Sequence, residues 1–327
     1  SVMMRYNVGA VIPVSTPAIM RENCKIFPAG GCFYRVKIMG DTKFADVMRL
    51  EKEIRSDIAD GRKKAGLYEK SMSIRFDTEP FLVLEVDPPP GYFLPYEAGE
   101  IVKFTAPIGK LFSVDGESLM AYDLNKHYQT LVAAVSGHGK SRLLRNCIVG
   151  LSKNCTPKDL QMYFIDFKND DLAVFSNLPH VKGFAWKQEE ASNIIMSLRD
   201  EVDKRITKKG KKYNNKHLLV IDEGAELDKS LDDTLSSVMK LGRSLGIHVL
   251  LATQYPTSAQ IGQKVNNAFT HRFVGRVGSA SNAAWACGIP DSGAELLRKP
   301  GAFLDIFGGQ INRFQTFTMT PEEEGIK

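Results

Sequence analysis

Short apolar segments alternate with polar or glycine-rich stretches over the C-terminal two-thirds of the chain. Five of these segments are apolar on both faces and are expected to be strands, at residues 131–135, 162–165, 218–221, 247–252 and 272–277. Strands buried on both faces are typical of a parallel sheet that is covered by helices on each side. The pattern therefore predicts an α/β domain with a mostly parallel sheet at residues 108–327.

Residues 1–107 have a different pattern. Strands are expected at residues 31–38, 74–76 and 81–86, and a helix is expected at residues 44–64, where apolar positions recur every three to four residues. Prolines 88–90 then interrupt regular structure, because proline fixes φ and lacks an N–H donor. We predict a small α+β domain and its linker at residues 1–107.

Composition excludes several classes of protein. The 327 residues are 43% hydrophobic and 25% charged, which excludes a disordered chain. The longest apolar runs are far shorter than the roughly 18 residues of a membrane-spanning helix. The five cysteines are odd in number and form no C-x-x-C pair, so a reducing cytoplasm is expected. The six histidines lack the spacing of metal ligands. A net charge of +5 permits nucleic-acid binding without establishing it.

A glycine-rich segment follows the first expected strand and precedes a helical pattern. Its glycines let backbone N–H groups surround phosphate oxygens, Lys140 supplies charge to the β- and γ-phosphates, and Ser141 offers a hydroxyl to Mg²⁺. The first position is Ala where glycine is usual, and the alternative is a chance glycine-rich turn. We predict an ATP–Mg²⁺ site formed by Ala134, Val135, Ser136, Gly137, His138, Gly139, Lys140 and Ser141.

Two later strands also end in polar residues. Asp222 is expected to bind the nucleotide and Mg²⁺ together with Ser141, and Glu223 to deprotonate the attacking water. Gln254 would lie by the γ-phosphate if its strand lies between the other two. These residues are also common at ordinary strand ends, and Gln254 precedes a proline. The predicted catalytic residues are thus Lys140, Glu223, Gln254 and an arginine.

Basic residues are the candidates for contact with DNA phosphates. A run of lysines follows an expected helix, and a second pair precedes a Pro-Gly turn. Such a run is equally typical of a solvated loop. The candidate DNA-binding residues are Lys208, Lys209, Lys211, Lys212, Arg298 and Lys299.

Several of these segments together resemble one family. Residues 134–141, the Leu-Val-Ile-Asp-Glu of 219–223 and residues 245–254 resemble the FtsK/SpoIIIE DNA translocases of the FtsK–HerA superfamily of P-loop ATPases. The stretches 164–181, 293–304 and 108–124 are also similar to that family. The resemblance extends over residues 30–320, and it is most specific between 128 and 306.

The resemblance implies a RecA-like P-loop NTPase motor, forming a ring that is usually hexameric around double-stranded DNA, with ATP between subunits. It implies that an arginine acts across the subunit boundary, and Arg272 is the position that matches, with Arg243 and Arg276 as alternatives. The family places basic residues after this strand, whereas residues 278–284 have none. No winged-helix domain or membrane anchor is recognisable, so we expect a cytoplasmic core motor.

Two other functions remain open from the sequence. A secretion or conjugation ATPase with related motifs would move protein or a single-stranded DNA–protein substrate. A non-hydrolysing assembly module would bind ATP only structurally. Stimulation of ATP hydrolysis by duplex DNA would separate the translocase from both.

Overall fold

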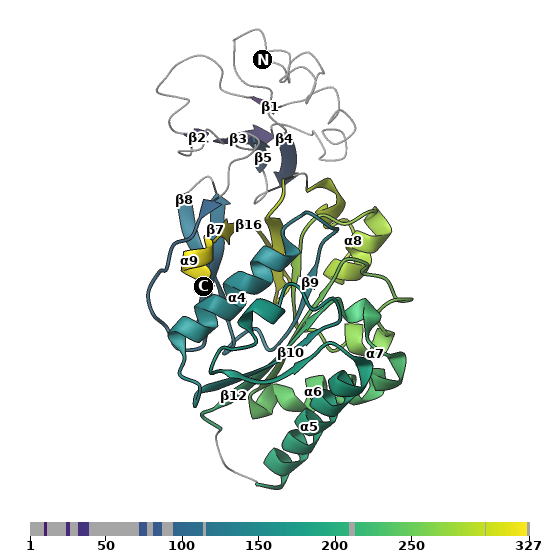
Figure 1. Ribbon diagram of the computed structural model, residues 1–327. Helices are drawn as coiled ribbons and strands as arrows, with labels where there is room; N and C mark the ends of the chain where they lie inside the picture. The colour runs from purple at the N-terminus through teal and green to yellow at the C-terminus, as the bar shows by residue number, and fades with distance from the viewer. Residues whose placement is uncertain are drawn as a thin grey trace. The chain divides into compact units, whose positions relative to one another are not determined.

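The computed structural model describes residues 10–11, 24–26, 32–38, 72–76, 81–86, 94–113, 116–208, 213–297 and 299–325 (Figure 1). The chain forms two compact units. One contains residues 1–93 and 112–117, and the other contains residues 94–111 and 118–327. The helix expected at residues 44–64 lies outside the described residues.

The first unit contains an antiparallel sheet. Its strand order is β1-β3-β5-β4, with β2 paired to β3. The three strands expected from the sequence are β3, β4 and β5. The strands are β1 (Ala10–Val11), β2 (Cys24–Ile26), β3 (Cys32–Ile38), β4 (Met72–Phe76) and β5 (Phe81–Val86).

The second unit is an α/β domain built on a largely parallel sheet, as the sequence predicts. Parallel pairing gives the order β11-β10-β12-β13-β9-β14. All five expected strands are present, and β11 is an addition at the edge. The strands are β9 (Gln129–Ala133), β10 (Leu160–Asp166), β11 (Val181–Ala185), β12 (Lys216–Asp222), β13 (Ile247–Thr253) and β14 (His271–Val274).

An antiparallel extension continues this sheet beyond β14. Strand β15 pairs with β14, β16 with β15, and β7 with β16, while β6 pairs with β16 in parallel. Strand β7 begins inside the stretch expected to be linker. The strands are β6 (Leu94–Pro95), β7 (Thr105–Ser113), β8 (Gly116–Asp123), β15 (Ala302–Phe307) and β16 (Gln310–Thr318).

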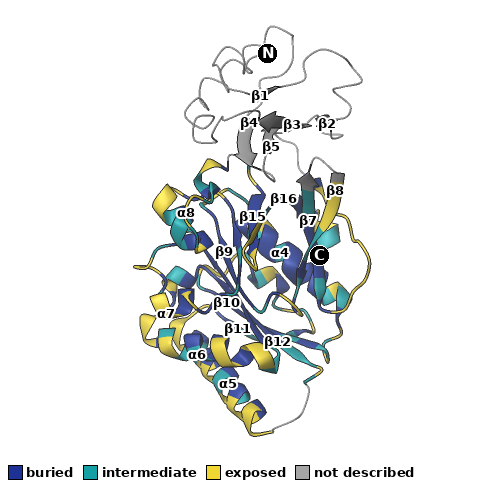
Figure 2. Ribbon diagram, turned by 180° about the vertical axis from the view of Figure 1, so that it is seen from behind, coloured by how far each residue is buried: buried dark blue, intermediate teal, exposed yellow. Residues whose placement is uncertain are grey.

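Helices cover both faces of the parallel strands, and their outer surfaces carry the exposed residues (Figure 2). Alternate residues of β9 show the two faces, since Leu131 packs with α5 and α6 whereas Val132 packs with α4. None of the described helices combines the length and apolar character that crossing a bilayer requires. The helices are α4 (Lys140–Asn154), α5 (Gln188–Thr207), α6 (Asp232–Gly242), α7 (Gln263–Asn266), α8 (Ala280–Cys287) and α9 (Pro321–Glu324).

A buried glutamine fixes the start of β9. The Gln129 side chain donates to the carbonyl oxygens of Met239 (2.7 Å) and Ile247 (3.1 Å), and it accepts the Val249 N–H (2.7 Å). These bonds satisfy backbone groups that would otherwise be buried without partners, and each such loss costs about 1–3 kcal/mol. The strand that leads into the glycine-rich loop is therefore anchored to both α6 and β13.

Histidines are buried at several places in this domain. Burial lowers the pKa of His127 to about 3, with a further lowering from the neighbouring His271, whose ring stacks at 3.9 Å between centroids. Burial also lowers the pKa of His248 to about 3 and that of His217 to about 4. Burial lowers the pKa of His271 as well, although Asp305 Oδ1, 2.7 Å from its Nε2, acts in the opposite direction.

These histidines predict an acid-sensitive fold. In the unfolded chain they titrate near pH 6.5, so below that pH the unfolded state binds protons that the folded state does not. The free energy of unfolding should therefore fall as the pH drops from about 6.5 to about 4, by up to about 1.4 kcal/mol per pH unit for each histidine. Urea unfolding at pH 7.5 and pH 5 measures this change. His248→Phe should reduce the slope of the unfolding free energy against pH by the contribution of one proton. Equal stability at the two pH values would contradict the prediction.

Candidate nucleotide-binding and hydrolysis site

The loop of residues 134–141 connects β9 to α4. Gly137 (φ 77°) and Gly139 (φ 96°) have left-handed backbones, which glycine adopts without steric cost. The Ala134 N–H donates to the Thr253 carbonyl oxygen (3.2 Å), and the Val135 N–H donates to that of Arg276 (2.8 Å). The start of the loop is thus fixed to the ends of the flanking strands, and its remaining N–H groups and the α4 N-terminus are suited to an anion.

The chain packs backbone to backbone against this loop. A Cβ on Gly139 would lie 3.0 Å from Gly301 Cα, and the Gly301 N–H donates to the His138 carbonyl oxygen (2.9 Å). Gln315 Nε2 donates to the Pro300 carbonyl oxygen (3.0 Å), which fixes the turn before β15. The hairpin β15–β16 therefore supports the loop from one side.

Lys140 and Asp222 form a buried ion pair beneath the loop. The Lys140 ammonium donates to Asp222 Oδ1, and both residues are buried. Burial raises the pKa of the Asp222 carboxyl, an effect that Lys140 opposes and that the nearby carboxylates of Asp171 and Asp166 reinforce. Lys140 is therefore the cation that balances a cluster of carboxylates at this edge of the sheet.

Glu223 has a strained backbone and a fixed side chain. Its φ of 56° lies in the left-handed region, which is costly for a residue other than glycine and is concentrated at functional sites. Its Oε1 accepts hydrogen bonds from Thr253 Oγ1 and the Gln254 N–H, both at 3.1 Å. Its Oε2 is buried and accepts no hydrogen bond from any described residue, with Lys168 Nζ 3.8 Å away. One carboxylate oxygen is therefore held in place and the other can accept a proton from a ligand.

Gln254 follows β13, and β13 pairs with β12 on one side and with β9 on the other. The condition on which the role of Gln254 depends, that its strand lies between the other two, is therefore met. Because the three strands are parallel, their carboxyl ends lie at the same edge, where Asp222, Glu223, Gln254 and the loop after β9 come together. This is the edge at which open α/β sheets bind ligands.

The oxygen atoms near Ser141 fit a hard divalent cation. Ser141 Oγ donates to Asp171 Oδ2, and Asp166 is the register partner of Asp222 at the adjacent strand end. Both oxygens of Asp166 are already occupied by backbone N–H groups of residues 168, 170 and 172. Among the described residues, no three His, Cys, Asp or Glu side chains form a ready metal cage. This donor set suits Mg²⁺, which is usually held by one or two carboxylates together with substrate phosphates and water.

Reasoning from the sequence gave no role to several residues of this site. Asp166 ends an apolar strand in the same way as Asp222, and that signal was available in the sequence. Asp171 and Thr253 carry no such signal. Asp171 reaches Ser141 only because the loop after β10 folds around Asp166. Thr253 differs from other strand residues only in its contact with Glu223.

Arg272 lies on β14, between β9 and β15. Its guanidinium donates to Asn266 Oδ1 (2.9 Å) and to the carbonyl oxygens of Asn266 (3.0 Å) and Ala286 (2.9 Å). In this subunit Arg272 therefore joins α7 to the end of α8, and its action on a neighbouring subunit stays a prediction. Arg276 is exposed beside the loop, and its side chain has no hydrogen bond or ion pair with any described residue. The Arg243 guanidinium lies 5.1 Å from the ring centre of Tyr128.

The candidate DNA-binding residues lie at two separate places. Lys208 is exposed at the end of α5, which is the edge of the sheet where β12 begins (Figure 1). Lys299 is half-buried, and it lies two residues before Gly301 on the side of the glycine-rich loop. Four further candidates lie outside the described residues: Lys209, Lys211, Lys212 and Arg298.

Four features together define a P-loop ATPase. They are the parallel sheet, the glycine-rich loop leading into α4, the buried Lys–Asp pair and an acidic residue at the adjacent strand end. Residues 103–229 match the FtsK/SpoIIIE family. This part of the chain is therefore similar to FtsK/SpoIIIE-type motors.

Relatives of known name are similar to this part of the chain. The DNA translocase FtsK of Borreliella burgdorferi is 26% identical over 228 residues, which are 62% of this chain and 29% of that protein. The ESX secretion system protein EccC of Geobacillus thermodenitrificans is 32% identical over 178 residues, which are 45% of this chain and 12% of EccC. The chain thus spans less than a third of the length of these relatives.

Among solved structures, the pCW3 conjugation coupling protein TcpA, in its monomer form with ATPγS, is similar with a TM-score of 0.62. The likeness covers 90% of this chain and 86% of TcpA at 19% identity. The cytoplasmic domain of the type VII secretion ATPase EccC from Thermomonospora curvata has a TM-score of 0.55 over 68% of this chain, at 23% identity. At these identities, both likenesses show a shared fold.

Proposed function

We propose that the chain is the motor of an ATP-driven double-stranded DNA translocase that assembles as a ring and hydrolyses ATP at subunit interfaces. The observation that carries the proposal is the position of Glu223. Thr253 and the Gln254 N–H fix one oxygen of its carboxylate beside the Lys140–Asp222 pair, and its other oxygen is buried and has no hydrogen-bond partner among the described residues. DNA as the substrate is supported by the similarity to DNA translocases named FtsK.

Each residue of the site has a separate role in this proposal. The N–H groups of the loop and the Lys140 ammonium hold the phosphates, so that ATP binding separates Lys140 from Asp222. Ser141 and Asp222 would hold Mg²⁺, which neutralises charge on the phosphates when it is bound. Glu223 takes a proton from the attacking water at Oε2, the oxygen that accepts no hydrogen bond from a described residue. Gln254 lies next to that carboxylate and contacts the γ-phosphate.

A second candidate function is a conjugation or secretion ATPase that moves protein or a single-stranded DNA–protein substrate. Two observations favour it. The EccC relative has a higher identity, 32% over 178 residues, than the 26% over 228 residues of the FtsK relative. The fold of TcpA, a conjugation coupling protein, also corresponds to this chain over most of both lengths.

Substitutions should separate phosphate binding from water activation. Lys140→Ala should weaken ATP binding because it removes the buried cation, whereas Glu223→Gln should bind ATP normally and lower the rate of phosphate release by about 10²–10⁴-fold. Calorimetry with ATP and a phosphate-release assay measure both effects. Glu226→Gln changes an exposed carboxylate three residues away and should leave both unchanged. Normal hydrolysis by Glu223→Gln would assign the general base to another residue.

Duplex DNA should bind without sequence preference and stimulate ATP hydrolysis. Because lysine contacts to phosphates release counterions, the affinity should fall linearly with the logarithm of salt concentration, and each lost contact should reduce the slope by about 1. Two unrelated duplexes and a single strand of equal length are titrated at several salt concentrations against wild type, Lys208→Ala and Lys299→Ala. Stimulation by the single strand alone would favour the second candidate function instead.

An arginine of one subunit should complete the site of its neighbour, an effect worth about 10³–10⁵ in rate in other nucleotide hydrolases. Arg272→Ala subunits mixed with Glu223→Gln subunits should regain activity, because each Arg272→Ala site keeps its own base and receives an arginine from its neighbour. The same mixture is made with Arg276→Ala. Recovery with Arg276→Ala but not with Arg272→Ala would transfer the role to Arg276, since Arg272 is bonded within its own subunit.

A further inference from the structure

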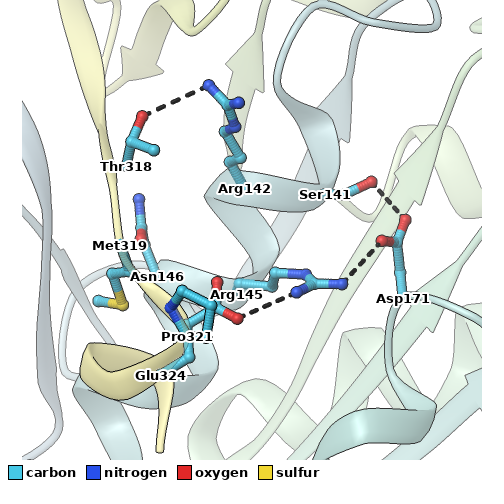
Figure 3. Close-up of a pocket in the computed structure, with 9 residues that line it drawn as sticks. All are labelled: Ser141, Arg142, Arg145, Asn146, Asp171, Thr318, Met319, Pro321 and Glu324. Carbon is cyan, nitrogen blue, oxygen red and sulfur yellow. Dashed lines mark hydrogen bonds and ion pairs between the residues drawn. The ribbon is translucent and has the colours of Figure 1, made fainter. Parts of the chain in front are cut away.

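A cavity of about 320 Å³ lies beside the first two turns of α4 (Figure 3). Arg145 of α4 lines it, as do Thr318 and Met319, where the chain passes from β16 toward α9. Ser141 of the glycine-rich loop and Asp171 of the loop after β10 line it too. The cavity therefore borders the oxygen atoms that fit a divalent cation, and the residues of α9 complete its lining.

Four side chains around the cavity are linked by successive contacts, which Figure 3 shows as dashed lines. Ser141 Oγ donates to Asp171 Oδ2. Arg145 Nη2 lies 3.5 Å from Asp171 Oδ1, and Arg145 Nη1 lies 3.0 Å from Glu324 Oε2. These four residues form the cavity network, which connects the hydroxyl expected to bind Mg²⁺ to helix α9.

The contact with Asp171 orients the Ser141 hydroxyl for a cation. A serine hydroxyl has one hydrogen to donate and two lone pairs. Because the hydrogen is donated to a carboxylate, the lone pairs stay available on the oxygen, and oxygen lone pairs are what a hard cation binds. Groups that hydrogen-bond to a metal ligand fix its orientation in other metal sites, and their loss typically costs about 10–100-fold in metal affinity.

Asp171 is placed to act through Ser141 rather than as a ligand itself. One oxygen of its carboxylate accepts the Ser141 hydroxyl, and the other faces the Arg145 guanidinium. Turning either oxygen toward a cation would break one of these contacts. The side chains of Asp171 and Arg145 are only 25% and 24% exposed, so solvent screens this pair less than it screens a surface pair. Arg145 thus holds the carboxylate in the orientation that serves Ser141.

Helix α9 is attached to α4 without the Glu324 side chain. The Thr320 N–H donates to Glu323 Oε2 (2.7 Å) and the Glu323 N–H donates to Thr320 Oγ1 (3.3 Å), which closes a capping box at the start of α9. Lys153 Nζ, in the last turn of α4, donates to the Glu323 carbonyl oxygen (2.6 Å). Because these bonds hold α9 in place, the contact between Glu324 and Arg145 can serve the orientation of Arg145.

We propose that Asp171 is a positioning residue for Mg²⁺, oriented by Arg145, and that α9 sets the affinity for the cation through Glu324. The inference rests on the proposed function and deepens it by naming a regulation of the same site. Any change that moves α9 away from α4 would release Arg145 and weaken the binding of ATP with Mg²⁺, without a change in the glycine-rich loop.

The test is calorimetry of the full chain with ATPγS, once with Mg²⁺ and once with EDTA. The dissociation constant in EDTA divided by that in Mg²⁺ measures how much the cation contributes to nucleotide binding. Asp171→Asn should reduce this ratio by about tenfold or more and leave the affinity in EDTA unchanged, because only the cation contact is affected. Glu324→Gln should reduce the ratio by about 2–30-fold, the range for changes along a coupled network.

Two controls and a double variant show whether Asp171 acts through Ser141. Asp170→Asn and Glu322→Gln change exposed carboxylates on the same loop and the same helix, and both should leave the ratio unchanged. In a chain that carries Ser141→Ala, Asp171→Asn should have no further effect, because the hydroxyl that it orients is gone. A merely structural role of Asp171 would instead weaken ATPγS binding equally with Mg²⁺ and with EDTA.

Three results would overturn the inference while leaving the proposed function standing: an unchanged ratio in Asp171→Asn, equal weakening with Mg²⁺ and with EDTA, or additive effects of Asp171→Asn and Ser141→Ala. Glu324→Gln leaves the loop after β10 intact and gives a second test if Asp171→Asn fails to fold, since an unchanged ratio there would also overturn the inference. Failure of wild type to bind ATPγS under either condition would overturn the proposed function itself.

Discussion

The parallel pairing of β12, β13 and β9 is the constraint on which the rest of the site depends. Strand β13 is hydrogen-bonded along its length to both neighbours, so the ends of three segments that are far apart in the sequence lie at one edge. That pairing brings Lys140 to Asp222 and Glu223 to Thr253. Gln129 fixes β9 against β13 through its side chain in addition to the backbone ladder, so the start of the strand that leads into the loop is held at two levels.

The antiparallel strands give the site a second support, of a different kind. They come from both ends of the domain, because β7 precedes the parallel strands in the sequence and β15 and β16 follow them. The hairpin of β15 and β16 places backbone, with no intervening side chain, against the glycine-rich loop. The same segment then continues past β16 to line the cavity beside α4. One stretch of chain thus contacts both the place expected to hold phosphates and the space next to it.

Much of this arrangement could be predicted from residue patterns, and the reasons for success and failure are physical. Strands buried on both faces are continuously apolar, so the five central strands were predictable. Apolar character gives no strand order, so the position of β13 between β12 and β9 comes from the structure. The partners of β16 were not, because β7 pairs with it across about two hundred residues and strand pairing leaves no local signal. Asp222 ends a strand in a recognisable way, whereas Asp171 acquires its contact with Ser141 only through the path of a loop. The cavity likewise depends on how α4 packs against the chain after β16, which no local pattern encodes.

The contact between Gly139 and Gly301 has a thermodynamic consequence. Because the His138 carbonyl oxygen accepts the Gly301 N–H, the loop and the hairpin cannot open independently at this point. A ligand that binds only the closed loop stabilises it by RT ln(1 + [L]/Kd), about 2.7 kcal/mol at a hundredfold excess over Kd, and that free energy is shared with the hairpin. Amide hydrogens at the start of β15, although they touch no ligand, would then exchange with solvent more slowly whenever the loop is occupied.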